Sequence, residues 1–189
     1  MTVVFTETSD DIRASRMRRI RIVSQAMSSC CIAAAALLFA GMALYWLMTP
    51  TQTLLAHAGV ATGAETGIGL PIRLAGFFVS MLPLGATIFA LLKVGGCFKA
   101  FAGGAIFQSG PIRDLKIFAV AIAVSAVLKP VAGALLSLLL SWAAGGQLRL
   151  AVHVGSDQIL ALLLAGAVAV AAWVWAEAIA LADENAQFV

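Results

Sequence analysis

The chain has 189 residues, of which 62% are hydrophobic and only 11% are charged, with a formal net charge of +3. Soluble domains carry roughly 25% charged residues, so this chain has too few polar groups to cover a surface that faces water. The composition excludes an ordinary soluble domain and predicts an integral membrane protein.

The N-terminal region is basic. Residues 8–27, TSDDIRASRMRRIRIVSQAM, precede the first apolar segment. Ser9 is a suitable N-cap, and Asp10 and Asp11 suit the positive end of a helix dipole. We therefore expect a cytoplasmic helix over 1–26 whose arginines lie among anionic headgroups. Membrane topology explains this run better than nucleic-acid binding, and no direct contact with nucleic acid is expected.

Four apolar segments are long enough to cross a bilayer, which requires about 20 residues of helix. They cover residues 27–48, 74–92, 117–140 and 159–181. The first is longer than a signal-peptide core of about 7–15 residues, which favours an uncleaved anchor over cleavage near AHA at 56–58. We predict an all-α integral membrane protein, a four-transmembrane-helix bundle that forms a single domain.

Basic residues fall mainly on one side of the predicted membrane. Nine precede the first span or lie between the second and third, whereas Arg73 and Arg149 lie on the other side. Since basic loops stay in the cytoplasm, we expect both termini and the middle loop there. The aromatic residues expected at the interfaces are Tyr45, Trp46 and Trp142 outside and Trp173 and Trp175 inside.

The connecting regions show two patterns. The middle loop, KVGGCFKAFAGGAIFQSGPIRDLK, is glycine-rich, and Ser109 before Pro111 favours a helix start. We expect a helical hairpin on the inner surface, or alternatively a docking surface for a cytoplasmic partner.

Residues 148–154 alternate between apolar and other residues, which predicts a short extracytoplasmic β-strand. That strand would form a hairpin with the region around TLLAHAGVA.

Few residues could bind a metal or perform catalysis. His57 and His153 would share the outer face, but the spacing supplies no third ligand, so they are weak metal or haem candidates and no cofactor is predicted. The three cysteines, Cys30, Cys31 and Cys97, have no paired spacing and are expected to be buried thiols. No catalytic motif is present, which favours a protein that is not an enzyme.

A lysine and a proline interrupt the third span, in AVSAVLKPVAGALLS at 123–137. Moving the span in either direction would bring other charged residues or glycines into lipid, so Lys129 stays near the midplane. Insertion scales put the cost of such a lysine at about 2.5–3.5 kcal/mol. A residue at that cost is a candidate for function, although a lysine that extends to the interface without a role is the alternative.

Lys129 has polar neighbours on the predicted helices. Ser125 lies one turn away, and Pro130 leaves a carbonyl of its own helix unpaired. Pro83 does the same in the second span, where Ser80 lies nearby. We predict a midplane site for a ligand or partner made of these five residues. Because no Asp or Glu of the chain is expected at that depth, the counter-ion would be a carbonyl cage, a ligand anion or an acid of another chain.

The fourth span carries a ridge that recurs every four residues and ends at Glu177. Its other members are Ala161, Ala165, Ala169 and Trp173. Small residues allow close helix contact, so we expect Glu177 to enter the bundle near the inner surface. There Lys93, Lys116 or Arg21 could pair with it. The alternative is that Glu177 lies among the headgroups.

Two stretches of the chain resemble a known family. FKAFAGGAIFQSGPIRDLKIFA in the middle loop, and VHVGSDQILALLLAGAV followed by WAEAIALADENAQFV at the C-terminus, resemble the bacterial membrane proteins of the domain of unknown function 2975 family. The resemblance covers about residues 30–189. It implies four spans in a bacterial inner membrane and a gene that often lies beside one for a small helix-turn-helix regulator, which suggests a role in membrane-linked regulation. No activity or site residue is known for the family, and the Lys129-Pro130 pair is not matched to it.

Two classes of function fit these features. The first is a non-enzymatic regulatory or accessory membrane protein that senses a signal and docks a cytoplasmic regulator. The second is a small transporter or channel subunit with a midplane polar site. Besides the lipid bilayer, the sequence allows a homo- or hetero-oligomer.

Overall fold

The computed structural model describes residues 3–57, 69–104, 109–144, 150, 152 and 154–187. The helices in these ranges are α1 (Val3–Met48), α2 (Thr51–His57), α3 (Leu70–Ala102), α4 (Ser109–Ala143) and α5 (Ser156–Gln187). Four of them, α1, α3, α4 and α5, are long and apolar enough to cross a membrane. The prediction of an all-helical protein with four candidate spans is confirmed.

Each long helix extends beyond the predicted span. α1 begins at Val3, so the basic segment and the first span form one helix and Ser9 lies inside it rather than at its cap. α3 starts with Pro71 in its first turn, where proline is tolerated because the first N–H groups have no intrahelical acceptor. α4 starts at Ser109 as predicted.

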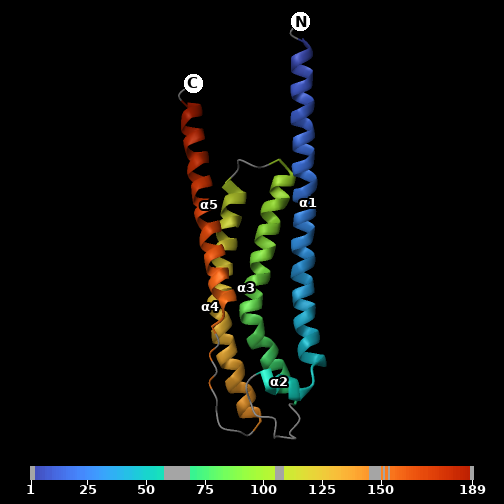
Figure 1. Ribbon diagram of the computed structural model, residues 1–189, viewed down its shortest axis with the longest axis vertical. Coiled ribbons are helices and arrows are strands. Elements are labelled where there is room, and N and C mark those ends of the chain that lie inside the picture. The colour runs from blue at the N-terminus through green and yellow to red at the C-terminus, as the bar shows by residue number, and fades with distance from the viewer. Residues whose placement is uncertain are drawn as a thin grey trace.

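The two ends of the molecule differ (Figure 1). The N-terminus of α1, the C-terminus of α5, the end of α3 and the start of α4 lie at one end, which we call the N/C end. α2, the start of α3 and the end of α4 lie at the other, the α2 end. α1 and α5 project beyond α3 and α4 at the N/C end.

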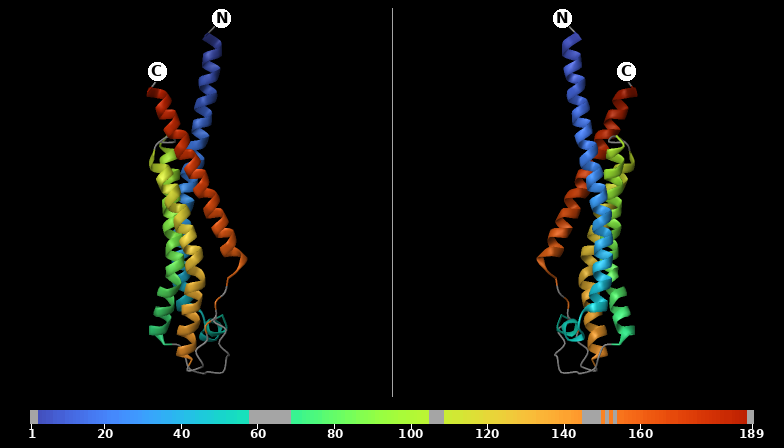
Figure 2. Two further views of the ribbon diagram at one scale, coloured as in Figure 1. Left: turned by 90° about the vertical axis from the view of Figure 1, so that its left-hand side faces the viewer. Right: turned by 90° about the vertical axis from the view of Figure 1, so that its right-hand side faces the viewer.

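α5 is displaced along the bundle axis. It begins beside the middle of α4 rather than at the α2 end (Figure 1), and its first turns lean away from the other helices (Figure 2). α3 packs against both α1 and α4, whereas α5 packs mainly against α4. The described helices therefore form an open arrangement rather than a closed four-helix bundle.

Small side chains allow α1 and α3 to approach closely. Ser24, Ser28, Cys31 and Ala35 are buried along one face of α1, at a spacing that keeps them on a single stripe. A Cβ on Gly95 of α3 would lie 3.3 Å from the Cβ of Cys31. Small residues at such contacts are typical of membrane helix packing, which depends on van der Waals contact.

A larger apolar cluster closes the α2 end. Trp46 of α1, Leu54 of α2 and Leu140 of α4 are buried together. Trp46 is only 3% exposed, so its indole faces the neighbouring helices rather than the surrounding medium. Its indole packs on Gly76, where an added Cβ would overlap the ring.

Two predictions for the loops are corrected. The described part of 148–154 contains no strand, because its expected partner around residue 54 forms α2 and satisfies its backbone bonds within that helix. The described residues of the middle loop do not form a separate helical hairpin but belong to the two long helices. Residues 93–102 continue α3, and 109–116 are the first turns of α4 (Figure 1).

Candidate functional site

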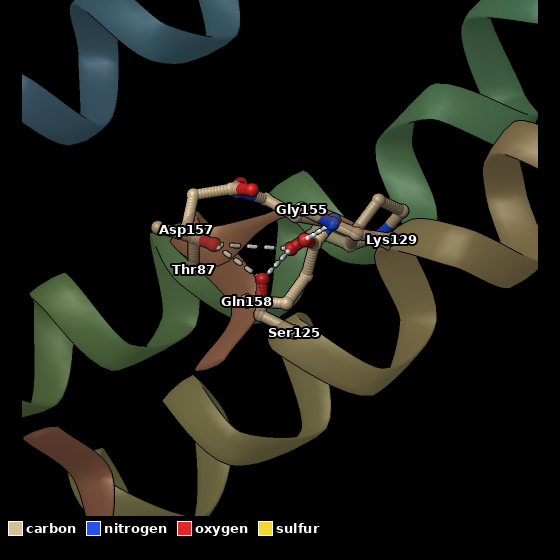
Figure 3. A network of polar contacts seen from close by, with 7 residues as sticks. Thr87, Ser125, Lys129, Gly155, Asp157 and Gln158 are labelled. Carbon is tan, nitrogen blue, oxygen red and sulfur yellow. Dashed lines mark hydrogen bonds and ion pairs between the residues drawn. The ribbon is translucent and has the colours of Figure 1, made fainter. Parts of the chain in front are cut away.

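Lys129 forms an ion pair with Asp157 beside the middle of the bundle. Its Nζ donates to Oδ2 of Asp157 at 2.9 Å (Figure 3). The side chains are 47% and 61% exposed, so both charges are open to the surrounding medium. The pair connects the centre of α4 to the first turn of α5.

The start of α5 positions the carboxylate. Asp157 lies in the first helical turn, where a negative charge is stabilised by the helix dipole. The side-chain oxygen of Gln158 accepts from the backbone N–H of Gly155, as an N3 residue does in a capping box. These local interactions stabilise the start of α5 at this depth and hold Asp157 near Lys129.

The expectation that no acid of this chain lies at the depth of Lys129 is therefore wrong. It assumed that α5 begins at the far surface, as α3 does. In the structure α4 continues to the α2 end, whereas α5 begins beside the middle of α4 (Figure 1). The sequence signal was the helix start at Ser156 and Asp157, which identifies the end of the helix but not its depth.

Ser125 and Pro83 do lie together, at the contact of α3 with α4. The Ser125 hydroxyl donates to the Pro83 carbonyl at 2.8 Å, and its oxygen lies 2.7 Å from that of Thr87 (Figure 3). Thr87 Oγ1 also donates to the Pro83 carbonyl, at 3.1 Å. Sequence reasoning missed Thr87, although it lies one turn from Pro83 on the same helix face.

These hydroxyls do not surround the ammonium group as predicted, because Lys129 points to α5. Ser80 belongs to a different cluster. It accepts a hydrogen bond from Trp46 Nε1 at 3.1 Å and donates to the Gly76 carbonyl at 2.9 Å. Pro130, next to Lys129, is half-buried in α4. The predicted single site is thus divided into an α4–α5 ion pair, an α3–α4 hydroxyl cluster and an α1–α3 indole contact.

Arg73 is a further polar residue that the sequence analysis treated only as a loop charge. Its Nη1 donates to the carbonyls of Trp46 and Leu47 at 3.0 and 3.2 Å. Its Nη2 donates to Thr51 Oγ1 at 3.3 Å. The carbonyls at a helix C-terminus lack intrahelical donors, so Arg73 caps α1 from α3 and fixes the turn into α2.

A cavity of about 500 Å³ lies near the α2 end between α1 and α4, with α3 behind it. Its wall is almost entirely apolar, apart from Ser80 and Ser137. The displaced α5 does not contribute to its lining. The lining residues include Leu37 and Tyr45 of α1 and Gly133 and Leu136 of α4.

The charges near the N/C end pair differently from the prediction. Lys93 lies 3.8 Å from Asp114 rather than near Glu177, and its ammonium is 5.6 Å from the centroid of the Phe89 ring. Glu177 and Lys116 are exposed. Among the described side chains, Glu177 has no ion-pair partner.

Helical geometry explains why Glu177 does not face the other helices as the four-residue ridge predicted. Each step of four residues advances about 40° beyond a full turn, so the predicted ridge rotates by about 160° between Ala161 and Glu177. Ala165 and Ala172 are buried, whereas Trp173 is 70% exposed. The packed face of α5 therefore follows a seven-residue spacing, and Trp175 on that face packs on Phe101 with ring centroids 5.5 Å apart.

The residues that the sequence analysis considered as metal ligands or buried thiols are two histidines and three cysteines. The side chains of His57 and His153 lie outside the described part of the chain. Among the described residues, no group of three or more His, Cys, Asp or Glu could hold a metal ion. Cys31 and Cys97 are buried thiols as expected, whereas Cys30 is exposed on the surface of α1.

No family model, no curated protein and no solved structure matches this chain.

Proposed function

We propose that this chain is a non-enzymatic, multi-pass membrane protein of regulatory or accessory type, in which α5 moves relative to the other helices. The observation that supports it is the Lys129–Asp157 ion pair, which joins the start of α5 to the centre of α4 while both charges are exposed. The opposite end of α5 projects beyond α3 and α4 at the N/C end (Figure 1). A change at the ion pair would therefore move a projecting helix end.

The strength of this ion pair depends on what surrounds it. In hydrocarbon, separation leaves two unsolvated charges and is strongly unfavourable. In water, an exposed pair contributes little, since both ions are solvated when they separate. Water, protons or a small ion reaching this depth would weaken the contact of α5 with α4. The projecting end of α5, near the basic half of α1, would then change its interaction with a cytoplasmic regulator.

The pair is tested with Lys129→Met, Asp157→Asn and the charge exchange Lys129→Asp with Asp157→Lys, in the full-length protein in lipid nanodiscs. We expect faster hydrogen exchange in the first turns of α5 for each single variant, and recovery in the exchanged variant. Lys99→Met, at an exposed lysine near the N/C end, is the matched control. In cells, Lys129→Met should change the proteins retained by the chain, and the charge-exchanged variant should restore them.

Unchanged hydrogen exchange in the first turns of α5 for Lys129→Met would overturn this proposal.

A second function, a small transporter or channel subunit, is favoured by irregular backbone at Gly155 beside the ion pair. Such backbone at membrane depth needs protein or water around it. Proton or anion flux in liposomes that is lost in Lys129→Met would identify transport instead.

In either case we propose a bacterial inner-membrane location with both termini in the cytoplasm, as the distribution of Lys and Arg and the resemblance to the domain of unknown function 2975 family suggest.

A further inference from the structure

Besides the cavity near the α2 end, a groove near the N/C end combines an apolar wall with a basic rim. It has a volume of about 470 Å³ and lies between α3 and α4. The wall consists of Ala86 and Phe89 of α3 and Ile117, Val120, Ala121 and Val124 of α4, and Lys116 completes the lining. Val120 is 63% exposed, and Phe89 and Val124 are about half exposed, so the groove opens outward rather than into the bundle.

The two ends of the groove differ, because only one of them carries a charged residue. α4 runs from the N/C end toward the α2 end (Figure 1), so Lys116 lies at the end of the groove nearer the N/C end and Val124 lies deeper. Eight residues of helix separate them, or about 12 Å at 1.5 Å per residue. The groove is therefore elongated along the helices, with its charge at one end.

A second lysine lies at the same end. Lys93 is one turn beyond Phe89 on α3, and its ammonium is 5.6 Å from the Phe89 ring centroid. The contacts of Lys93 with Asp114 and of Thr87 with Ser125 set the antiparallel register, which puts Lys93 level with Lys116. Asp114 offsets part of the charge of Lys93, whereas Lys116 has no ion pair among the described side chains.

We propose that this groove binds an anionic phospholipid from the leaflet at the N/C end, with an acyl chain along the apolar wall and the headgroup phosphate at Lys116 and Lys93. Basic pockets between membrane helices are suited to such headgroups because the ammonium groups meet the phosphate where the hydrocarbon ends. The charged end distinguishes this groove from the larger cavity near the α2 end, whose lining contains no charged residue.

The test uses full-length protein in detergent, incubated with palmitoyl-oleoyl phosphatidylglycerol or with phosphatidylcholine of the same chains. Native mass spectrometry measures the affinity of the first bound lipid. We expect phosphatidylglycerol to bind more tightly than phosphatidylcholine. Lys116→Gln should weaken phosphatidylglycerol binding about fivefold, the effect of about 1 kcal/mol per basic residue, with little change for phosphatidylcholine.

Two further variants separate the headgroup from the chain. Val120→Trp places a large side chain over the groove and should weaken both lipids. Lys99→Gln changes an exposed lysine of α3 that does not line the groove, and should alter neither. Glycerol phosphate, which has the anion but no acyl chain, should not compete with the lipid.

Equal affinity for the two lipids would overturn the proposal, as would equal effects of Lys116→Gln and Lys99→Gln. Competition by glycerol phosphate would assign the site to a soluble phosphate rather than a lipid. If Val120→Trp does not fold, Lys116→Gln decides the question, because it replaces an exposed side chain without breaking an ion pair.

Discussion

Single polar residues connect helices that the sequence shows only as separate segments. Arg73 reaches from the start of α3 to two carbonyls at the end of α1 and to a hydroxyl of α2. Its guanidinium has enough N–H donors in a fixed planar arrangement to bond all three acceptors. A residue that sequence patterns place in a loop thus stabilises the junction of three helices.

Arg73→Gln should lower the stability of the protein by about 1 kcal/mol, because the last carbonyls of α1 lose a charged donor at the negative end of the helix dipole. Unfolding by SDS in mixed micelles measures the change. Arg113→Gln, an exposed arginine at the N/C end, is the matched control and should have a smaller effect. Equal losses in the two variants would argue against the capping role.

At the scale of the helix, glycine has opposite effects at two positions of α3. Gly76 lies against the Trp46 indole, where an added Cβ overlaps the ring, whereas nothing lies within 4 Å of a Cβ at Gly85. The first glycine is required by packing between α1 and α3. The second only adds flexibility to the unfolded chain.

Gly76→Ala should therefore destabilise the protein by about 1–3 kcal/mol, the usual cost of overpacking a core contact. Gly85→Ala should stabilise it by about 0.5–1 kcal/mol, the difference between glycine and alanine in a helix. The two variants differ by the same methyl group in the same helix, so SDS unfolding and intrinsic tryptophan fluorescence compare them directly. A stable Gly76→Ala variant with unchanged fluorescence would contradict the contact.

For α5, the sequence predicts where the helix lies along the chain but not its depth or rotation relative to the other helices. Its existence and its start follow from the apolar run at 159–181, and the helix begins three residues earlier, at Ser156, and extends to Gln187. Its depth and rotation do not follow, because they depend on the residues of α4 that it contacts. The four-residue ridge predicted an inward Glu177, whereas the packed face follows Ala165 and Ala172.

For the whole molecule, α1 begins and α5 ends at the N/C end, where α3 also ends and α4 begins (Figure 1). Four membrane crossings require both termini on the same side. Reporter fusions test the proposed orientation. Fusions at Gln108 and Val189 should report the cytoplasm, and a fusion at Thr62 the outside, because nine of the basic residues outside the spans lie on the first side. An outside signal at Val189 alone would contradict the four-span topology. Reversed signals from all three fusions would contradict the orientation.

The sequence by itself determined that the chain is helical, that four helices are long enough to cross a membrane, and that Lys129 lies near the centre of one of them. These properties depend on local composition and length, since a helix satisfies its own backbone bonds in lipid. The tertiary structure decided that Asp157 is the partner of Lys129, that Ser80 bonds Trp46, and that Trp46 is buried. Each of these contacts joins residues at least 28 positions apart in different helices, and their formation depends on the relative shift and rotation of helices, which no local pattern specifies.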